Sequence, residues 1–305
     1  MTANLIVILG PTASGKTKLA ARMGKDLGAE IISADSRQVY RGMNIGTGKD
    51  LGDYVVDGVC IPYHLIDVVD PDYEFNVFEY QRLFFKCFFE IRARNVLPIL
   101  TGGTGLYIEA VLQKYRMSAV PVNCVFRTDT VNEEMEALKK RFLTLNPSPH
   151  NTTDLLEKRR LIRAIEIAER SKNIGAGEQF AFPRLNPIVI GIRWERPVIR
   201  QRITSRLRER LAAGMIEEVK DLHDKGIDWE KMNFFGLEYR YIGLYLQGKI
   251  DYQEMFRQLN TRIHQFAKRQ ETWFRKMERQ GTLIYWLDNP EYKDLKSTVE
   301  ALLSE

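Results

Sequence analysis

The sequence has few cysteines and histidines, and none of them has the spacing of a metal module or a disulfide framework. Three cysteines and four histidines are scattered over 305 residues. Such usage suits a reducing compartment and argues against a zinc module. No apolar run approaches the roughly 18–20 residues of a membrane helix, and the run at 5–9 lacks the basic flank of a signal peptide. We therefore expect a soluble, cytoplasmic protein that does not enter a membrane.

Low-complexity tracts and internal repeats are also absent, and the composition is ordinary for a globular protein. Hydrophobic residues make up 44% of the chain and charged residues 28%, which excludes disorder and predicts one large domain or two unequal ones. The net charge of +5 is unevenly placed: residues 1–113 carry 11 basic and 13 acidic side chains, whereas 196–280 carry 18 and 12. This asymmetry favours a polyanionic partner, although solvated helices give the same counts.

Alternating strand and helix patterns predict an α/β fold. Continuous β-prone runs indicate buried strands at 5–9, 30–34, 96–100 and 188–192, with a last strand near 283–287. Helical patterns follow at 16–27 and from 106 onward. Strands that alternate with helices form βαβ units, so we expect a parallel sheet flanked by helices, as in P-loop NTPases.

Between residues 114 and 187 helical periodicity replaces this alternation. It is strongest at 131–145 and 154–170, which predicts a small helical insertion domain. The expected organisation is a first part of the catalytic core at 1–113, the insertion at 114–187 and the rest of the core at 188–305. Helices are expected in that last part near 197–213, 215–225, 237–247 and 251–278.

A complete phosphate-binding motif follows the first predicted strand. Residues 10–17 read GPTASGKT and match G-x-x-x-x-G-K-[ST] between a strand and a helix. Glycines let backbone N–H groups face a diphosphate, the lysine adds a charge, and the threonine hydroxyl can hold Mg²⁺. The predicted contacts are Gly10, Pro11, Thr12, Ala13, Ser14, Gly15, Lys16 and Thr17, with Thr17 as the metal ligand.

Two further loops leave the same predicted edge of the sheet, where α/β folds bind ligands. Asp35 follows the second strand and is a candidate general base, a Mg²⁺ ligand or a helix cap. Thr104, in the run Gly102–Gly105, offers a hydroxyl beside the phosphates, although a plain strand-to-helix turn has the same composition.

These motifs together resemble those of tRNA dimethylallyltransferases, also called tRNA isopentenyltransferases. The similarity lies in GPTASGKT (10–17), DSRQVY with RGMNIGTGK (35–49), HLID (64–67) and PILTGGTGLY (98–107). It continues in the same order with RRLIRAIEI (159–167), YLQG (245–248) and AKRQETWFR (267–275). The ordered set is specific and covers nearly the whole chain. The eukaryotic C-terminal zinc finger has no counterpart here, which indicates the bacterial type.

The resemblance implies transfer of a dimethylallyl group from dimethylallyl diphosphate to N6 of adenosine-37, beside the anticodon of tRNA, with Mg²⁺ as cofactor. By motif, Asp35 is the catalytic base, and Lys16, Thr17 and Arg206 assist at the diphosphate. The implied partner is the anticodon stem-loop, bound by a monomer. The implied tRNA contacts are Asp35, Ser36, Arg37, Gln38, Thr104, Arg127, Arg159, Arg160, Leu161, Ile162, Arg163 and Arg240. One departure is Glu238, an acid in Gly236–Arg240 where relatives often carry a Gly-Tyr pair.

The chemistry favours the base over the cap for Asp35. The exocyclic amine of adenine is too weak an acid to lose a proton before reaction. As the C–N bond forms the nitrogen becomes cationic, and a carboxylate with a pKa of about 3.9 can then accept the proton.

The charged helices supply further candidates for RNA contacts. Arg159, Arg160 and Arg163 recur at helical spacing and can grip phosphates, or form a solvated face. Five residues of the last long helix can contact RNA or pack in the core: Lys268, Arg269, Gln270, Trp273 and Arg275.

Three alternatives share parts of this pattern. A P-loop nucleotide or nucleoside kinase would use the same Mg²⁺ and aspartate, with the insertion as a lid. An RNA-binding NTPase switch, with ATP or GTP in the phosphate loop, would need a second acidic Mg²⁺ motif, for which Asp67 is the candidate. An isopentenyltransferase acting on free adenine nucleotides would not need the basic C-terminal half.

Overall fold

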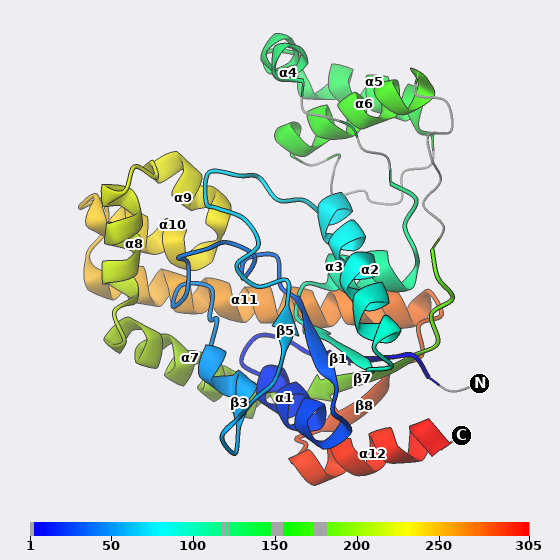
Figure 1. Ribbon diagram of the computed structural model, residues 1–305. Helices are drawn as coiled ribbons and strands as arrows, with labels where there is room; N and C mark the ends of the chain where they lie inside the picture. Colours follow the sequence, from blue (N-terminus) through cyan, green and yellow to red (C-terminus); the bar gives the residue numbers. More distant parts are fainter. Residues whose placement is uncertain are drawn as a thin grey trace. The chain divides into compact units, whose positions relative to one another are not determined.

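The computed structural model divides the chain into two compact units (Figure 1). It describes residues 3–117, 120, 123–147, 155, 157–173 and 182–304. The core unit comprises Met1–Lys114 and Pro183–Glu305, and the insertion unit comprises Tyr115–Phe182. The sequence had placed the insertion at 114–187. Within the described ranges, no helix is long and apolar enough to cross a membrane.

A six-stranded parallel sheet forms the centre of the core unit, which confirms the predicted fold class. The strand order is β5-β2-β6-β1-β7-β8. The bounds are β1 Leu5–Leu9, β2 Glu30–Ala34, β5 Tyr63–His64, β6 Pro98–Gly102, β7 Pro187–Arg193 and β8 Tyr285–Asp288. Every residue of β1, β2 and β6 is buried, as expected for parallel strands covered on both faces. β6 begins two residues later than the apolar pattern suggested.

Helices cover both faces of this sheet. Alternate strand residues such as Ile6, Ile8 and Ile190 pack with Leu295 and Val299 of α12 and with Ala20 of α1, and Figure 1 shows α2 and α3 on the opposite face. The helices of the core unit are α1 Lys16–Leu27, α2 Val77–Ala93, α3 Gly105–Leu112, α7 Arg196–Ala212, α8 Met215–Asp224, α9 Trp229–Phe235, α10 Leu237–Leu246, α11 Tyr252–Arg279 and α12 Tyr292–Ser304.

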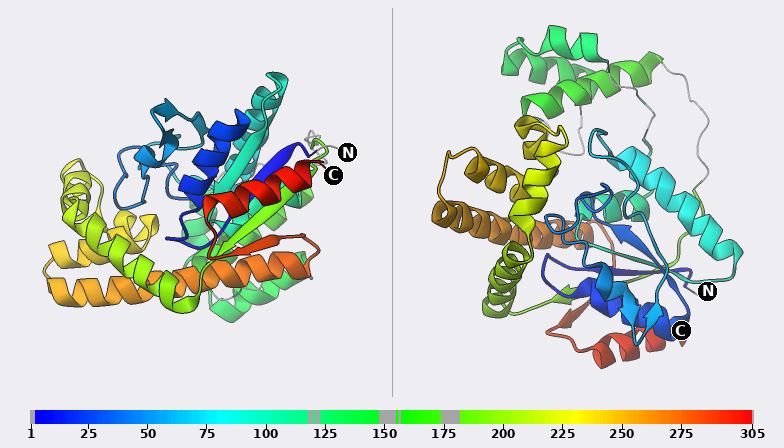
Figure 2. Two further views of the ribbon diagram at one scale, coloured as in Figure 1. Left: turned by 90° about the horizontal axis from the view of Figure 1, so that it is seen from below. Right: turned by 60° about the vertical axis from the view of Figure 1, so that its left-hand side comes forward.

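The long helix α11 links the sheet to a cluster of shorter helices. Figure 2 shows it running from α8–α10 along the sheet to α3, and it packs against α10, α7 and α3. A short 3₁₀ turn at Leu51–Tyr54 and a hairpin of β3 (Val55–Val56) and β4 (Val59–Cys60) precede β5. Helix α2 was not expected from the sequence. Its start is nevertheless encoded, because Asn76 and Glu79 form a capping box.

The insertion unit is a small helical unit with its own core. Its helices are α4 Cys124–Thr130, α5 Met135–Leu145 and α6 Lys158–Asn173. Leu138 and Phe142 of α5 pack against Leu161, Ile162 and Ile165 of α6. The residues from 148 to 154, which include the predicted start of the second helix at 154, lie outside the described part.

Candidate functional site

Three loops meet at the carboxyl edge of the sheet, after the neighbouring strands β1, β2 and β6. The Thr104 N–H, after β6, donates to the Ala34 carbonyl of β2 at 3.1 Å. The Ser36 N–H in turn donates to the Thr104 hydroxyl at 3.0 Å. These bonds place the loop that follows Asp35 beside the loop that contains Thr104. The two predicted ligand loops therefore lie side by side next to the phosphate loop.

The phosphate loop is built for close approach of its own backbone. Gly15 has a φ of 81° in the left-handed region, and a Cβ on Gly10 would lie 2.9 Å from the Ile192 carbonyl oxygen. Glycine is therefore required at both positions. The Ser14 hydroxyl is buried, and no described residue gives it a hydrogen bond. A buried hydroxyl without a hydrogen-bond partner destabilises the fold unless a ligand pairs with it. A diphosphate, whose oxygens accept hydrogen bonds, is such a ligand.

Lys16 lies among charged neighbours at this loop. Its Nζ donates to the Pro11 carbonyl at 3.2 Å. Burial lowers the pKa of Lys16 to about 8, while Asp35 raises it and Arg206 lowers it further. Two cations and one carboxylate thus act on one another beside the loop, and an anion placed there would relieve the repulsion between the cations.

Side chains from outside the motif hold the loop's backbone. Arg202 Nε donates to the Ala13 carbonyl at 2.9 Å, and Trp194 Nε1 donates to the Ser14 carbonyl at 2.8 Å. The Arg202 guanidinium also lies 4.3 Å from the centroid of the Trp194 indole ring. Sequence reasoning missed both residues. Arg202 had a signal, since Arg202, Arg206 and Arg210 recur every fourth residue along α7.

Arg206 and Arg210 face the loop at residues 44–50. Arg206 Nη2 donates to Asp50 Oδ2 at 2.7 Å and to the Gly48 carbonyl at 3.3 Å. Arg210 donates to the carbonyls of Ile45 and Gly46 and pairs with Glu238 at 3.2 Å. The acid that departs from the family pattern is therefore the partner of an arginine on α7.

Glu218 of α8 fixes the same loop from its other side. Its carboxylate accepts the N–H groups of Asn44, Ile45 and Gly46 at 2.8, 2.6 and 2.8 Å. It also accepts the Tyr239 hydroxyl at 2.8 Å. Sequence analysis did not identify Glu218, because its partners in this loop lie more than 170 residues away in the chain. The loop is thus held by α7, α8 and α10 together.

Asp35 has the hydrogen bonds of a cap and still leaves one carboxylate oxygen available for the role of base. Its Oδ1 accepts the N–H groups of Arg37 at 2.8 Å and Gln38 at 3.3 Å, which is a capping geometry. Within the described residues, Oδ2 receives no hydrogen bond. One oxygen closes the turn, and the other is left to accept a proton.

The side chains after Asp35 differ in how many hydrogen bonds and ion pairs they form within the protein. The Gln38 amide accepts from Ser33 at 3.2 Å and donates to the Gly48 carbonyl at 3.0 Å. The Arg37 guanidinium lies 5.1 Å from the Phe234 ring, and burial lowers its pKa. No described carboxylate forms an ion pair with Arg37. Of these residues, Arg37 is the one best prepared to meet an anion.

Helix α11 closes the site through Gln270. Its Oε1 accepts the Thr12 N–H at 2.8 Å, and its Nε2 donates to the Gly103 carbonyl at 2.8 Å. One turn further on, the Trp273 ring lies so close to Gly105 that a Cβ there would collide with it. The expected RNA contact by Gln270 is thereby corrected, because its amide is 7% exposed and joins two loops of the protein. Lys268, Arg269 and Arg275 on the same helix are exposed.

Asp67 does not provide the acidic Mg²⁺ motif that an NTPase switch requires. It pairs with the buried Lys49 ammonium, which also donates to the Tyr40 carbonyl. Across the described part of the chain, no three His, Cys, Asp or Glu side chains gather in a way that could hold a metal ion. Thr17 stands in the first turn of α1, directly after Lys16.

In the insertion unit, a buried acid binds two of the predicted tRNA contacts. Glu166 is 2% exposed and pairs with Arg163 at 2.7 Å and Arg127 at 3.3 Å. Arg163 also donates to the Val120 carbonyl at 2.7 Å. These two arginines therefore stabilise the insertion unit, in addition to any contact with tRNA.

The rest of the 159–163 segment divides between surface and core. Arg159 is exposed, and Arg160 pairs with Glu157 at 2.9 Å. Leu161 and Ile162 are buried at 0% and 4% exposure, so the predicted tRNA contact by their side chains is wrong. The helical period turns them toward α5 while their neighbours face solvent. In the core unit, Arg240 is exposed on α10.

Two family models match the chain. The model described as IPP transferase matches residues 38–277, and the model described as isopentenyl transferase matches residues 3–57. Together they include all three loops of the site, helix α7 and helix α11 up to residue 277.

Curated and solved proteins agree with these matches. The chain is 57% identical to tRNA dimethylallyltransferase 1 of Syntrophus aciditrophicus, over 99% of both chains. It is 55% identical to tRNA dimethylallyltransferase 1 of Geotalea uraniireducens, over 94% of this chain and 93% of the other. The crystal structure of a tRNA isopentenylpyrophosphate transferase from Bacillus halodurans aligns with a TM-score of 0.70 at 32% identity, over 99% and 97% of the chains. A eukaryotic dimethylallyltransferase acting on tRNA shares the fold at 21% identity, with a TM-score of 0.77.

Proposed function

The chain belongs to the IPP transferase family, and from that premise we propose that it is a tRNA dimethylallyltransferase. Its substrates are dimethylallyl diphosphate and the adenosine on the 3′ side of a tRNA anticodon. The observation that carries this proposal is the convergence of Lys16, Asp35 and Arg206 at a glycine-rich phosphate loop. Cations for a leaving diphosphate and a carboxylate for a departing proton are the groups that prenyl transfer to an amine requires.

The reaction forms one C–N bond, breaks one C–O bond and moves one proton from N6 to Asp35. The N6 nitrogen of adenosine attacks C1 of the dimethylallyl group, and the C1–O bond breaks so that its electron pair leaves with the diphosphate. Lys16, Arg206 and the backbone N–H groups of the phosphate loop stabilise the charge that develops there. Asp35 Oδ2 takes the proton that N6 loses as it becomes cationic. Oδ1 keeps its bonds to the Arg37 and Gln38 N–H groups throughout, so the carboxylate stays in position.

Mg²⁺ is the cofactor in this proposal. The Thr17 hydroxyl would hold it, and oxygens of the diphosphate and water would complete its shell. When bound, the ion neutralises charge on the diphosphate. The side chains of the loop fit this arrangement, because the Thr17 hydroxyl is an oxygen ligand of the kind that Mg²⁺ takes and the buried Ser14 hydroxyl has no partner among the described residues.

We assign tRNA recognition to residues of the core unit and, separately, to residues of the insertion unit. In the core unit they surround Asp35 and include the exposed Arg240. In the insertion unit they are the arginines of α4 and α6. The proposed contacts are Ser36, Arg37, Gln38, Thr104, Arg127, Arg159, Arg160, Arg163 and Arg240. Moving a base out of its stack costs a few kcal/mol, and less in a loop than in a duplex, which suits an anticodon target.

The test is mass spectrometry of nucleosides from tRNA incubated with the protein, Mg²⁺ and dimethylallyl diphosphate. We expect one adenosine per acceptor tRNA to gain a dimethylallyl group, and no gain without the prenyl donor. A parallel incubation with ATP labelled in its γ-phosphate tests the kinase alternative. Label transferred to a nucleoside or nucleotide, without prenylated tRNA, would overturn the proposal.

A further inference from the structure

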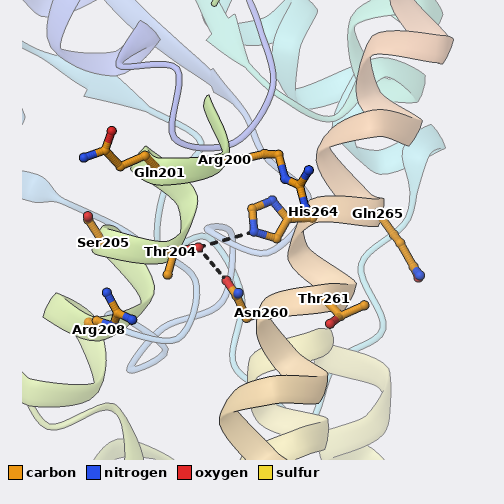
Figure 3. A pocket seen from close by; sticks show the side chains of 9 residues that line it. All are labelled: Arg200, Gln201, Thr204, Ser205, Arg208, Asn260, Thr261, His264 and Gln265. Atoms are coloured by element: carbon orange, nitrogen blue, oxygen red, sulfur yellow. Dashed lines mark hydrogen bonds between the residues drawn. The ribbon is translucent and has the colours of Figure 1, made fainter. Parts of the chain in front are cut away.

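A polar cavity of about 600 Å³ lies between α7 and α11, and the proposed reaction does not use it (Figure 3). Helix α7 contributes Arg200, Thr204 and Arg208 to its wall, and α11 contributes Asn260, His264 and Gln265. None of the residues that line the cavity is acidic. All of them belong to the core unit.

This α7–α11 cavity is separate from the phosphate loop. Arg202, Arg206 and Arg210 of α7 bond to the phosphate loop and to the loop at 44–50. Arg200, Thr204 and Arg208 follow the same four-residue spacing on another side of the helix. Between the two sets runs the buried stripe of Ile199, Ile203, Leu207 and Leu211. Helix α7 thus presents one row of arginines to the proposed reaction site and two further arginines to the α7–α11 cavity.

The floor of the cavity is already ordered by hydrogen bonds. The Thr204 hydroxyl lies 3.1 Å from Asn260 Oδ1 and 3.3 Å from His264 Nε2, and Figure 3 shows these three side chains turned toward one another. Burial and the neighbouring Arg200 lower the pKa of His264, so its ring is uncharged at neutral pH. The positive charge of the cavity therefore comes from its two arginines.

Neither of these arginines is used in an ion pair with a described residue. Arg208 lies 5.6 Å from the Phe256 ring, and Arg200 acts on His264 by charge alone. Arg257 and Arg275 of α11 are different, since each is paired with a glutamate on its own helix. Arg200 and Arg208 are separated by eight residues, or about 12 Å along a helix axis. Two unpaired cations at this spacing, with hydroxyl and amide groups between them, suit an extended polyanion better than one compact anion.

We propose that the α7–α11 cavity binds the phosphodiester backbone of the tRNA at a place distinct from the reacting adenosine. The inference rests on the proposed function for its ligand. Arg200 and Arg208 neutralise two phosphates, and the Asn260 and Gln265 amides reach sugar or phosphate oxygens. Such contacts strengthen and orient binding without reading the sequence.

The decisive variant is the double substitution Arg200→Gln with Arg208→Gln. Each change keeps an exposed helical position polar and removes one charge. The matched control is Arg22→Gln with Lys293→Gln, which removes the same charge from α1 and α12. Binding of fluorescently labelled acceptor tRNA is measured by anisotropy over a series of salt concentrations, and prenyl transfer is measured in single turnover at saturating tRNA.

For the cavity variant we expect the Kd for tRNA to rise about tenfold at low salt. The slope of log affinity against log salt should flatten by about 1.4–1.8, which corresponds to two phosphates. The rate of transfer from the saturated complex should stay within about twofold of wild type, because neither arginine touches the reacting groups. The control should keep the wild-type slope.

Three outcomes would contradict the proposal. An unchanged slope in the cavity variant, in a protein that still prenylates tRNA, removes the cavity from RNA binding and leaves the proposed function intact. An equal loss in the control shows that net charge alone acts. Binding of inorganic phosphate that needs Arg200 and Arg208 but does not compete with tRNA at fixed ionic strength assigns the cavity to a free anion. Failure of wild type to bind or prenylate tRNA would instead count against the proposed function.

Discussion

Asp35 shows how a single side chain can serve structure and chemistry with different atoms. Its Oδ1 closes a turn by accepting two N–H groups, while Oδ2 stands free of described donors. The turn holds Arg37 and Ser36 next to Thr104. Because the turn depends only on an acceptor oxygen, the two roles can be separated by mutation.

Replacing Asp35 by asparagine should abolish the base and keep the turn. The amide oxygen can still accept the Arg37 and Gln38 N–H groups, but it cannot take a proton from N6. We expect kcat to fall about 10²–10⁴-fold, with KM for both substrates within a few-fold. Single-turnover transfer to an anticodon stem-loop, measured across a Mg²⁺ series, tests this. A near-wild-type rate in the Asp35→Asn variant would show that Asp35 acts only as a cap. Rescue of the rate by added Mg²⁺ would show that Asp35 is a metal ligand.

Lys16 should make diphosphate binding depend on pH in a predictable direction. Burial lowers its pKa to about 8 in the free protein, and a bound diphosphate favours the charged form. Loss of the Lys16 proton should therefore weaken affinity above about pH 8, by up to about tenfold per pH unit relative to Lys16→Met. Calorimetric titration with inorganic diphosphate measures this. Lys16→Met should bind weakly and show no break near pH 8.

Unfolding of the protein above pH 8 would not explain this expected loss of diphosphate affinity. Because the folded state lowers the pKa of Lys16, the unfolded chain binds more protons between about pH 8 and the ordinary lysine pKa. Folding stability from this group therefore rises with pH in that window. A break that persists in Lys16→Met would assign the titration to another group.

At the scale of elements, α11 joins the phosphate loop to the loop that contains Thr104. Gln270 bonds to Thr12 and Gly103, and Trp273 packs on Gly105. A strand edge alone leaves such loops without lateral support. The helix supplies it from residues that come more than 160 positions later in the chain.

Gln270→Leu should therefore misplace the phosphate loop without removing any group that touches substrate. The Thr12 N–H and Gly103 carbonyl lose their partners, at about 1–3 kcal/mol for each group that stays buried. We expect the Kd for diphosphate to rise and kcat to fall by at least about tenfold. Calorimetry and single-turnover rates test this beside thermal melts, with the exposed Gln253→Leu on the same helix as control. A lower melting temperature with unchanged Kd would reduce Gln270 to a packing residue.

At the scale of the whole molecule, the chain has two units with separate cores, and the proposed tRNA contacts come from both. The insertion unit is centred on Leu138, Phe142 and Leu161 and is closed by the ion pairs of Glu166. Among the proposed tRNA contacts of this unit, Arg159 is exposed, whereas Arg127 and Arg163 pair with the buried Glu166. Mutations in this unit should separate stability from affinity.

Arg159→Ala and Arg163→Ala should have opposite signatures. Arg159 is exposed, so its loss should leave stability within about 0.5 kcal/mol and flatten the salt slope of tRNA binding by about one unit. Arg163→Ala removes a partner of the buried Glu166 and should destabilise the insertion unit by about 2–3 kcal/mol. Thermal unfolding and anisotropy measure the two effects. Equal effects of both changes on the salt slope, without loss of stability in Arg163→Ala, would return Arg163 to a free RNA contact.

Local patterns in the sequence determined the parallel sheet, the phosphate loop and the order of the motifs. The strand at 5–9 and the glycines of 10–15 are contiguous, and strand burial and turn geometry follow from neighbouring residues. The helices α8 and α11 were likewise placed within one residue of their bounds, because their apolar periodicity is strong. Helix α2 escaped prediction, since aromatic residues on several of its faces blur that periodicity.

Only the tertiary structure decided which side chains complete the site. Glu218, Arg202 and Gln270 each bond to a loop more than 170 residues away, and no local pattern encodes such a pairing. Arg163 differs, because its partner Glu166 lies only three residues along α6; what the tertiary structure adds is that Glu166 is buried and also pairs with Arg127 of α4. Sequence fixes a residue's face on its own helix, but what that face meets depends on how the helices and strands pack.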